Sequence, residues 1–169
     1  ALATVAAVAL VAGGLAACAR APTIDRPAEA PPLVLEEFFL GTTVGTGRFE
    51  SRIAGVDRAF TVVTRGRWDG RTLTLREEFA FADGERDVKT WRFRKVAPGR
   101  YEGTREDVIG TADVRQDGPV VRLSYQAEVA GDDGGTTRLR FEDVIARRGP
   151  DEALNRAVVS RFGFPVGTV

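Results

Sequence analysis

Five ionisable side chains that fall on otherwise apolar faces of predicted strands have the residue types best suited to chemistry. They are Glu77, Lys89, Arg105, Asp107 and Asp143. Successive side chains of an extended chain point to opposite faces, so each of these residues shares a face with apolar neighbours two positions away. Because burying an isolated charge costs several kcal/mol or more, each of them needs a partner or a hydrated site.

Three arrangements meet that requirement. In a structural network, Glu77 pairs with Lys89 across one hairpin, and Asp107 pairs with Arg105 or Arg156. In a ligand site, the same groups form a polar patch that orients a head group inside a mostly apolar cavity, which a small barrel can provide. In an acid–base pair, Glu77 and Asp107 act as two catalytic carboxylates, although spacing alone does not establish this.

Aromatic residues share the faces of these charged groups. Trp91 lies on the face of Lys89, Tyr101 on that of Arg105, and Tyr125 on a wholly uncharged face. A tryptophan in such a position is more often a core residue than a ligand contact. The candidate ligand-binding set combines both kinds of side chain: Glu77, Lys89, Trp91, Tyr101, Asp107, Tyr125 and Asp143.

Composition excludes several function classes. The chain has no histidine and one cysteine, which removes the usual zinc, copper and haem ligands and the Ser-His and Cys-His nucleophile pairs. Lys plus Arg and Asp plus Glu each number 24, so no overall field attracts nucleic acid. We therefore expect no metal, no cofactor, no nucleic-acid partner and no enzymatic activity.

Period-two alternation between turn signals positions these residues on β-strands. The expected strands cover residues 44–54, 59–68, 72–81, 88–96, 101–108 resuming to 117, 120–130, 136–146 and, as strand rather than helix, the segment 154–169. Asp69-Gly70 is the strongest hairpin signal among the intervening turns. Residues 33–40 form an apolar patch that suits one helical turn plugging the domain.

Strands in series with short turns predict an all-β, antiparallel up-and-down barrel of about eight to ten strands, because a long meander avoids open edges by closing. No helical pattern of ten residues separates the strands, which argues against a parallel sheet. A two-sheet sandwich is the alternative.

The amino-terminal segment predicts a membrane anchor. Small residues before the only cysteine, Leu15-Ala16-Ala17-Cys18, end an apolar run and resemble a bacterial lipobox. We expect residues 1–17 to be a lipoprotein signal peptide that lacks its start, 18–32 a lipidated cysteine with an extended tether, and 33–169 the barrel domain. The alternative is a buried helix with an incidental cysteine. Ala19 in place of an aspartate favours the outer membrane, with the domain facing the periplasm of the bacterial envelope.

Short motifs along the barrel region suggest a family. They are Leu75-Arg76-Glu77-Glu78-Phe79 with Asp83-Gly84-Glu85, then Trp91 with Tyr101-Glu102-Gly103 and 107–112, and finally Asn155-Arg156-Ala157 with Arg161-Phe162-Gly163. Together with the lipobox, they resemble the DUF3833 family of bacterial lipoproteins. The resemblance implies an envelope lipoprotein with a lipocalin-like barrel and implies no catalytic residues.

These observations leave two functions open. The first is a binding module, anchored to the membrane through Cys18, for a hydrophobic or lipid-like molecule. The second is a structural or assembly factor of the envelope whose barrel has a solid core. A cavity inside the barrel favours the first, and a filled interior with an exposed apolar patch favours the second. The sequence names no protein partner.

Overall fold

The computed structural model describes residues 21–25, 29–131 and 134–169. The predicted signal peptide, Cys18 and part of the tether lie outside the described residues. The described chain forms one short helix and ten strands, in the order α1 (Leu35–Phe38), β1 (Gly41–Ser51), β2 (Val56–Trp68), β3 (Thr72–Phe81), β4 (Arg86–Ala97), β5 (Arg100–Thr104), β6 (Ala112–Asp117), β7 (Val120–Ala130), β8 (Thr136–Arg147), β9 (Ala153–Arg161) and β10 (Phe164–Thr168). In the described ranges, no helix is long and apolar enough to span a membrane.

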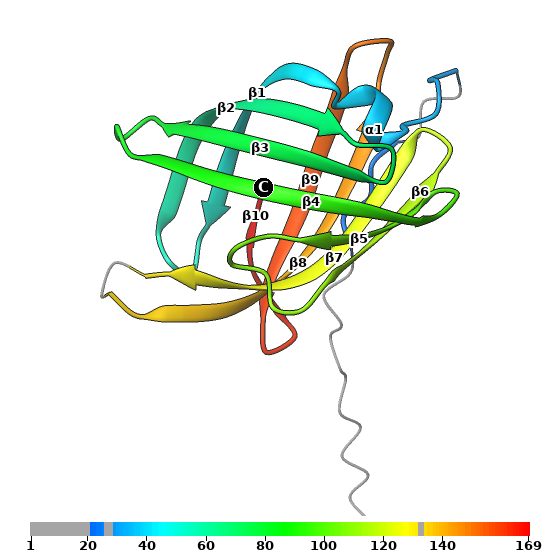
Figure 1. The fold of residues 1–169 in the computed structure, drawn as a ribbon. Helices are drawn as coiled ribbons and strands as arrows, with labels where there is room; N and C mark the ends of the chain where they lie inside the picture. Colours follow the sequence, from blue (N-terminus) through cyan, green and yellow to red (C-terminus); the bar gives the residue numbers. More distant parts are fainter. Residues whose placement is uncertain (1–20, 26–28, 132–133) are drawn as a thin grey trace, which may run out of the picture.

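The ten strands form a closed, antiparallel, up-and-down barrel (Figure 1). Each strand pairs with its sequence neighbour, and β1 pairs with β10 at Glu50 and Thr168 to close the ring. The predicted barrel is therefore confirmed, and the sandwich alternative is wrong. The carboxy-terminal segment is a hairpin, β9 and β10, that supplies the last two strands.

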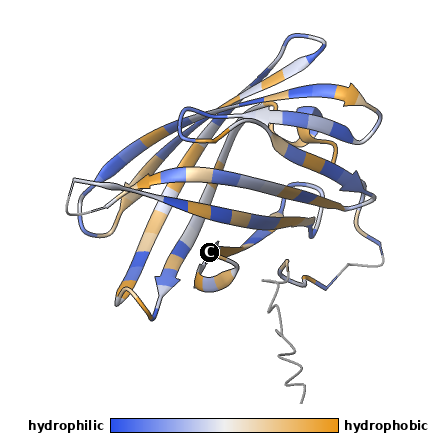
Figure 2. Ribbon diagram, turned by 90° about the horizontal axis from the view of Figure 1, so that it is seen from below, coloured by the Kyte–Doolittle hydropathy of each residue, from blue (hydrophilic) through white to orange (hydrophobic). Residues whose placement is uncertain are grey.

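Local sequence explains the register. At the predicted turn between β2 and β3, the Asp69 carboxylate accepts hydrogen bonds from the backbone N–H groups of Arg71 (2.8 Å) and Thr72 (2.7 Å), while Gly70 adopts a φ of 95°. Such a positive φ suits glycine. Polar and apolar residues then alternate along the strands (Figure 2), which directs one apolar set into the barrel.

One end of the barrel is closed. The backbone N–H of Leu33 donates to the carbonyl of Gly118 (2.9 Å), and the side chains of Leu33 and Leu35 are fully buried. As predicted, residues 33–40 include one helical turn, α1, which plugs this end (Figure 1). The plug packs on a continuous core of inward side chains: Leu73, Leu75, Trp91, Phe93, Tyr101, Ala112, Val114, Val121, Leu123, Tyr125 and Ala127.

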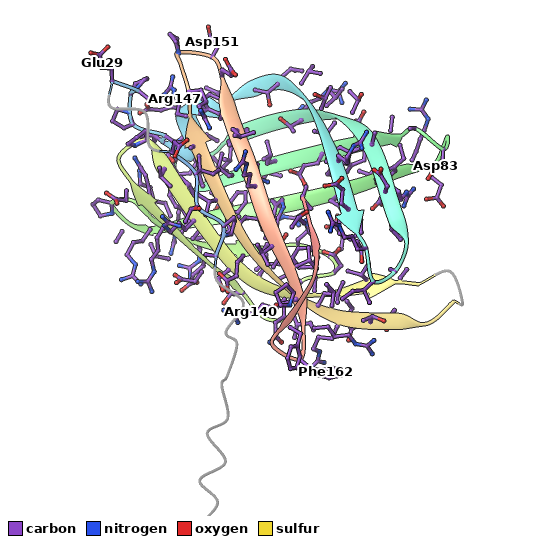
Figure 3. All side chains as sticks on the ribbon, turned by 180° about the vertical axis from the view of Figure 1, so that it is seen from behind. Glu29, Asp83, Arg140, Arg147, Asp151 and Phe162 are labelled. Atoms are coloured by element: carbon purple, nitrogen blue, oxygen red, sulfur yellow. The ribbon has the colours of Figure 1, made fainter. Side chains whose placement is uncertain are left out.

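The inward side chains toward the opposite end keep partial access to solvent. We call this region the open half of the interior, and it is lined by Gly45, Gly47, Phe60, Val62, Phe79, Phe81, Leu139 and Phe141. Each of these residues is half-buried, although it points into the barrel. Phe162, in the turn between β9 and β10, lies at this end, opposite Arg147 and Asp151 (Figure 3).

Candidate functional site

Polar side chains run around the inner wall between the closed core and the open half. We call them the interior polar belt, and they are Thr43, Thr64, Glu77, Lys89, Arg105, Asp107, Tyr125, Asp143 and, exposed at the edge of the belt, Asn155. The first four sit on adjacent strands in directly paired positions, so their side chains point the same way. The others come from the segment after β5 and from β7, β8 and β9. The belt thus gathers residues from most of the barrel.

Asp107 is the centre of an ion-pair cluster. Its carboxylate accepts from Arg105 Nε at 2.6 Å and Nη2 at 3.3 Å, and Lys89 Nζ lies 3.2 Å away. Lys89 also contacts Asp87 at 3.3 Å. Burial alone would raise the pKa of Asp107, but the hydrogen bonds and charges of Arg105 and Lys89 hold it below its usual value. The predicted pairing of Asp107 with Arg105 is confirmed.

Glu77 does not form the ion pair that the hairpin register favours. Its backbone lies directly opposite Lys89, yet the Lys89 ammonium turns to the two aspartates. The predicted Glu77–Lys89 pair is therefore wrong. The physical reason is that the segment after β5 brings the Asp107 carboxylate within 3.2 Å of Lys89. Lys89 forms its ion pair there, beside Arg105, and not with Glu77. Within the described residues the Glu77 carboxyl has no hydrogen bond.

The Glu77 side chain is half-buried, and its carboxyl has no ion-pair partner in the described part of the chain. We call such a carboxyl uncompensated. Burial raises its pKa from 4.5 to about 7, the charge of Arg105 opposes the rise, and the negative charges of Asp143, Glu106 and Asp107 add to it. Its neighbours on β3 mark the boundary of the site, because Leu75 is buried in the core and Phe79 is half-buried in the open half.

Asp143 is the second uncompensated carboxyl. Its Oδ1 accepts from Asn155 Nδ2 at 3.1 Å, whereas its buried Oδ2 has no hydrogen-bond partner in the described part of the chain. Burial raises its pKa from 3.8 to about 6, although the hydrogen bond from Asn155, the charge of Arg105 and the nearby Tyr125 hydroxyl oppose that rise. An unsatisfied buried acceptor is rare and costs about 1–3 kcal/mol.

Aromatic rings surround the belt. The Arg105 guanidinium lies 4.6 Å from the ring centre of Trp91 and 5.4 Å from that of Tyr125. Tyr125 packs edge-on to Trp91 and is stacked on Phe141, with ring centres 5.1 and 5.0 Å apart. Burial raises the pKa of the Tyr125 hydroxyl well above its ordinary value, which keeps it a neutral hydrogen-bonding group.

Tyr101 is the one member of the candidate set that lies away from the belt. Its hydroxyl donates to Glu36 Oε2 at 2.5 Å, and Lys95 Nζ donates to the other oxygen of that carboxylate. This cluster ties the α1 plug to β4 and β5. Sequence reasoning missed both Glu36 and Asn155, because neither lies on a face whose charge pattern draws attention.

The wall beside the belt is incomplete. β4 pairs with β5 only from Arg92 onward, and β6 pairs with β7 only up to Ser124. Residues 105–111 fill the interval: the Glu106 carboxylate accepts from the N–H of Thr90 at 2.9 and 3.0 Å, and the carbonyl of Asp107 accepts from the N–H of Glu128 at 2.9 Å. A surface hollow lined by Thr90, Arg92, Thr104, Arg105 and Glu106 marks this place.

The chemistry that these groups offer is hydrogen bonding and charge recognition. Asp107 is held ionised by the two cations Arg105 and Lys89, whereas burial raises the pKa of Glu77 to about 7. Among the described residues, no three His, Cys, Asp or Glu side chains are grouped to hold a metal ion.

The fold and the belt together define a closed up-and-down β-barrel that carries polar groups inside an otherwise apolar interior. A family model described as a protein of unknown function, DUF3833, matches residues 12–169. The chain therefore belongs to the DUF3833 family, as the motifs predicted. No curated protein and no solved structure matches the chain.

Proposed function

We propose that this protein is a membrane-anchored envelope lipoprotein whose barrel binds a hydrophobic or lipid-like molecule. The observation that carries the proposal is the contrast between the two halves of the interior. Inward residues near α1 are almost fully buried, as Leu73 and Val121 show, whereas inward residues such as Phe60 and Phe79 stay half-buried. Ligand sites combine apolar walls with a few convergent polar groups, and the open half with the belt has that composition.

The apolar wall of the open half is aromatic. Phe60, Phe79 and Phe81 form a cluster with ring centres 5.5 to 6.1 Å apart. The ring of Phe60 lies over Gly47 of the neighbouring strand so closely that a Cβ on Gly47 would clash with it. This wall supports the binding of an acyl chain or another flat apolar group in the open half.

The anchor is proposed from the lipobox alone. Cleavage before Cys18 and acylation would tether the barrel to the outer membrane on its periplasmic side, since two or more acyl chains anchor a protein stably. Cys18→Ser should abolish incorporation of a labelled fatty acid and leave the precursor uncleaved. Label on the serine variant would refute the anchor without affecting the binding proposal.

We propose a non-enzymatic role for the belt. The support is that Arg105 and Lys89 occupy both oxygens of Asp107, the expected second carboxylate of an acid–base pair. The same observation favours a belt that orients a bound molecule over one that transfers protons.

Binding is tested by titrating the full chain with the neutral fluorophore N-phenyl-1-naphthylamine. We expect saturable fluorescence enhancement and about tenfold weaker binding for Phe79→Ala, because a buried aromatic contact contributes about 1.4 kcal/mol or more. Phe164→Ala, at an exposed aromatic of β10, is the matched control and should bind normally. Absence of saturable binding, or equal loss in both variants, would refute the proposal.

A second candidate is an assembly factor, and exposed apolar side chains favour it. Ile53, Phe162 and Phe164 lie in or beside turns and are 78%, 87% and 64% exposed. In this position their apolar side chains do not contribute to the core of the barrel. Native mass spectrometry of the protein purified from its own host separates the two. A bound small molecule supports the binding module, whereas an empty barrel supports the assembly factor.

A further inference from the structure

The two uncompensated carboxyls of the belt come from opposite walls of the barrel. Glu77 is on β3 and Asp143 is on β8, and these strands are five positions apart in either direction around the ring of ten. Both side chains point inward, the negative charge of Asp143 raises the pKa of Glu77, and both carboxylates raise the pKa of Tyr125. The carboxyls therefore face a common interior space.

The cations near them are already engaged. Arg105 makes two hydrogen bonds to Asp107, and Lys89 is shared between Asp107 and Asp87. In the described belt, neither cation makes an ion pair with Glu77 or Asp143. The interior thus has more carboxylates than cations, and the buried Oδ2 of Asp143 has no donor.

From this arrangement we infer that the polar end of the bound molecule is a cationic nitrogen, received between Glu77 and Asp143. The inference rests on the proposed binding function and names the class of its ligand: an amphiphile with an ammonium head group. An ammonium group supplies a hydrogen-bond donor for the Oδ2 of Asp143 and an ion-pair partner for both carboxyls. An anionic head group would instead lie against two carboxylates.

The aromatic rings of the site support the same class. Arg105 already lies against the rings of Trp91 and Tyr125 at 4.6 and 5.4 Å, which shows that these rings accept a cation. Phe141, stacked on Tyr125 and half-buried, continues the aromatic surface toward the open half. Ring faces attract cations most strongly when water is excluded, as it is beside the buried Tyr125.

The test compares three twelve-carbon probes that differ only in the head group. Dodecylammonium, dodecanol and dodecanoate each displace N-phenyl-1-naphthylamine from the full chain at pH 7.5, below their micelle concentrations. We expect dodecylammonium to bind about tenfold more tightly than dodecanol and dodecanoate to bind most weakly, since one partly buried charge pair contributes about 1.4 kcal/mol.

Variants assign the preference to the two carboxyls. Glu77→Gln and Asp143→Asn should each reduce the preference for dodecylammonium, and the double variant should remove it, while dodecanol still binds. The retained dodecanol affinity shows that a variant is folded. Glu78→Gln is the matched control, because Glu78 is the next residue on β3 but points outward and contacts Arg65 at 2.6 Å.

The outcomes separate this inference from the function on which it rests. Equal or tighter binding of dodecanoate, or an unchanged preference in both single variants, would overturn the inference and leave a lipid-binding barrel. Displacement by none of the three probes would overturn both.

Discussion

Replacing Glu77 by glutamine should stabilise the barrel. The gain should appear only as the pH rises above 4.5, where the carboxyl of Glu77 ionises in the unfolded chain. Glu77 faces the interior without a hydrogen bond or ion pair among the residues that the structure describes, and burial raises its pKa from 4.5 to about 7. One pKa unit corresponds to about 1.4 kcal/mol, so ionising Glu77 in the folded barrel costs about 3 kcal/mol more than in the unfolded chain.

The sign of the pH dependence follows from proton binding. Between pH 4.5 and 7 the folded state keeps the Glu77 proton, whereas the unfolded state has lost it. The contribution of Glu77 to stability therefore falls as the pH rises through this window and is constant above it. Glu77→Gln lacks this loss, so it should be about 3 kcal/mol more stable than the wild type at pH 8 and nearly equal to it at pH 4.5.

Urea unfolding followed by tryptophan fluorescence at pH 4.5, 6, 7 and 8 measures the difference. Glu78→Gln is the control: hydrogen bonding to Arg65 lowers the pKa of this outward carboxyl, so this variant should show no gain in stability as the pH rises from 6 to 8. If Glu77→Gln and the wild type have parallel pH curves, or if Glu77→Gln is less stable at pH 8, then Glu77 has a partner and the reasoning fails.

Three further changes test other parts of the fold by the same unfolding measurement. Phe162→Gly should stabilise the protein by about 1 kcal/mol, because Phe162 has a φ of 51° and buries little surface; a loss of stability would show that its ring packs on the barrel. Gly66→Ala should cost about 3 kcal/mol, since its Cβ would overlap the carbonyl of Phe39 behind the plug; a neutral result would mean that the plug moves freely. Tyr101→Phe should cost about 1–3 kcal/mol by removing a donor from the buried Glu36 carboxylate; an unchanged midpoint would indicate that water replaces the hydroxyl.

Much of the barrel was predictable because its determinants are local. Alternation assigns the inward face of a strand without reference to any other strand, so Leu73, Leu75 and Phe79 were correctly placed together on β3. Turn residues such as Asp69-Gly70 define the hairpins, and short hairpins define the order of the strands. The inward direction of Glu77 and Asp143 follows from the same rule.

The partners of the belt residues depended on the tertiary structure. Hairpin register places Lys89 opposite Glu77, but the folded chain brings Asp107 and Arg105 to the same place from a segment that follows β5. The hydrogen bond from Asn155 on β9 to Asp143 on β8 likewise depends on how the two side chains are oriented in the folded barrel.

The sequence by itself thus determined most of the strands, their faces and the family, because these depend on neighbours within a few residues. It did not show that the run 101–117, expected as one interrupted strand, is divided into β5, the segment 105–111 with Arg105 and Asp107, and β6. Only the tertiary structure decided that α1 fills one end while the other half stays open, and that Glu77 and Asp143 make no ion pair in the described part of the chain. Those properties depend on how ten strands close into a ring and on which carboxylate, distant in the sequence, pairs with each cation in the folded barrel. The residue pattern along one strand contains no information on how the barrel closes or on which distant side chains come into contact.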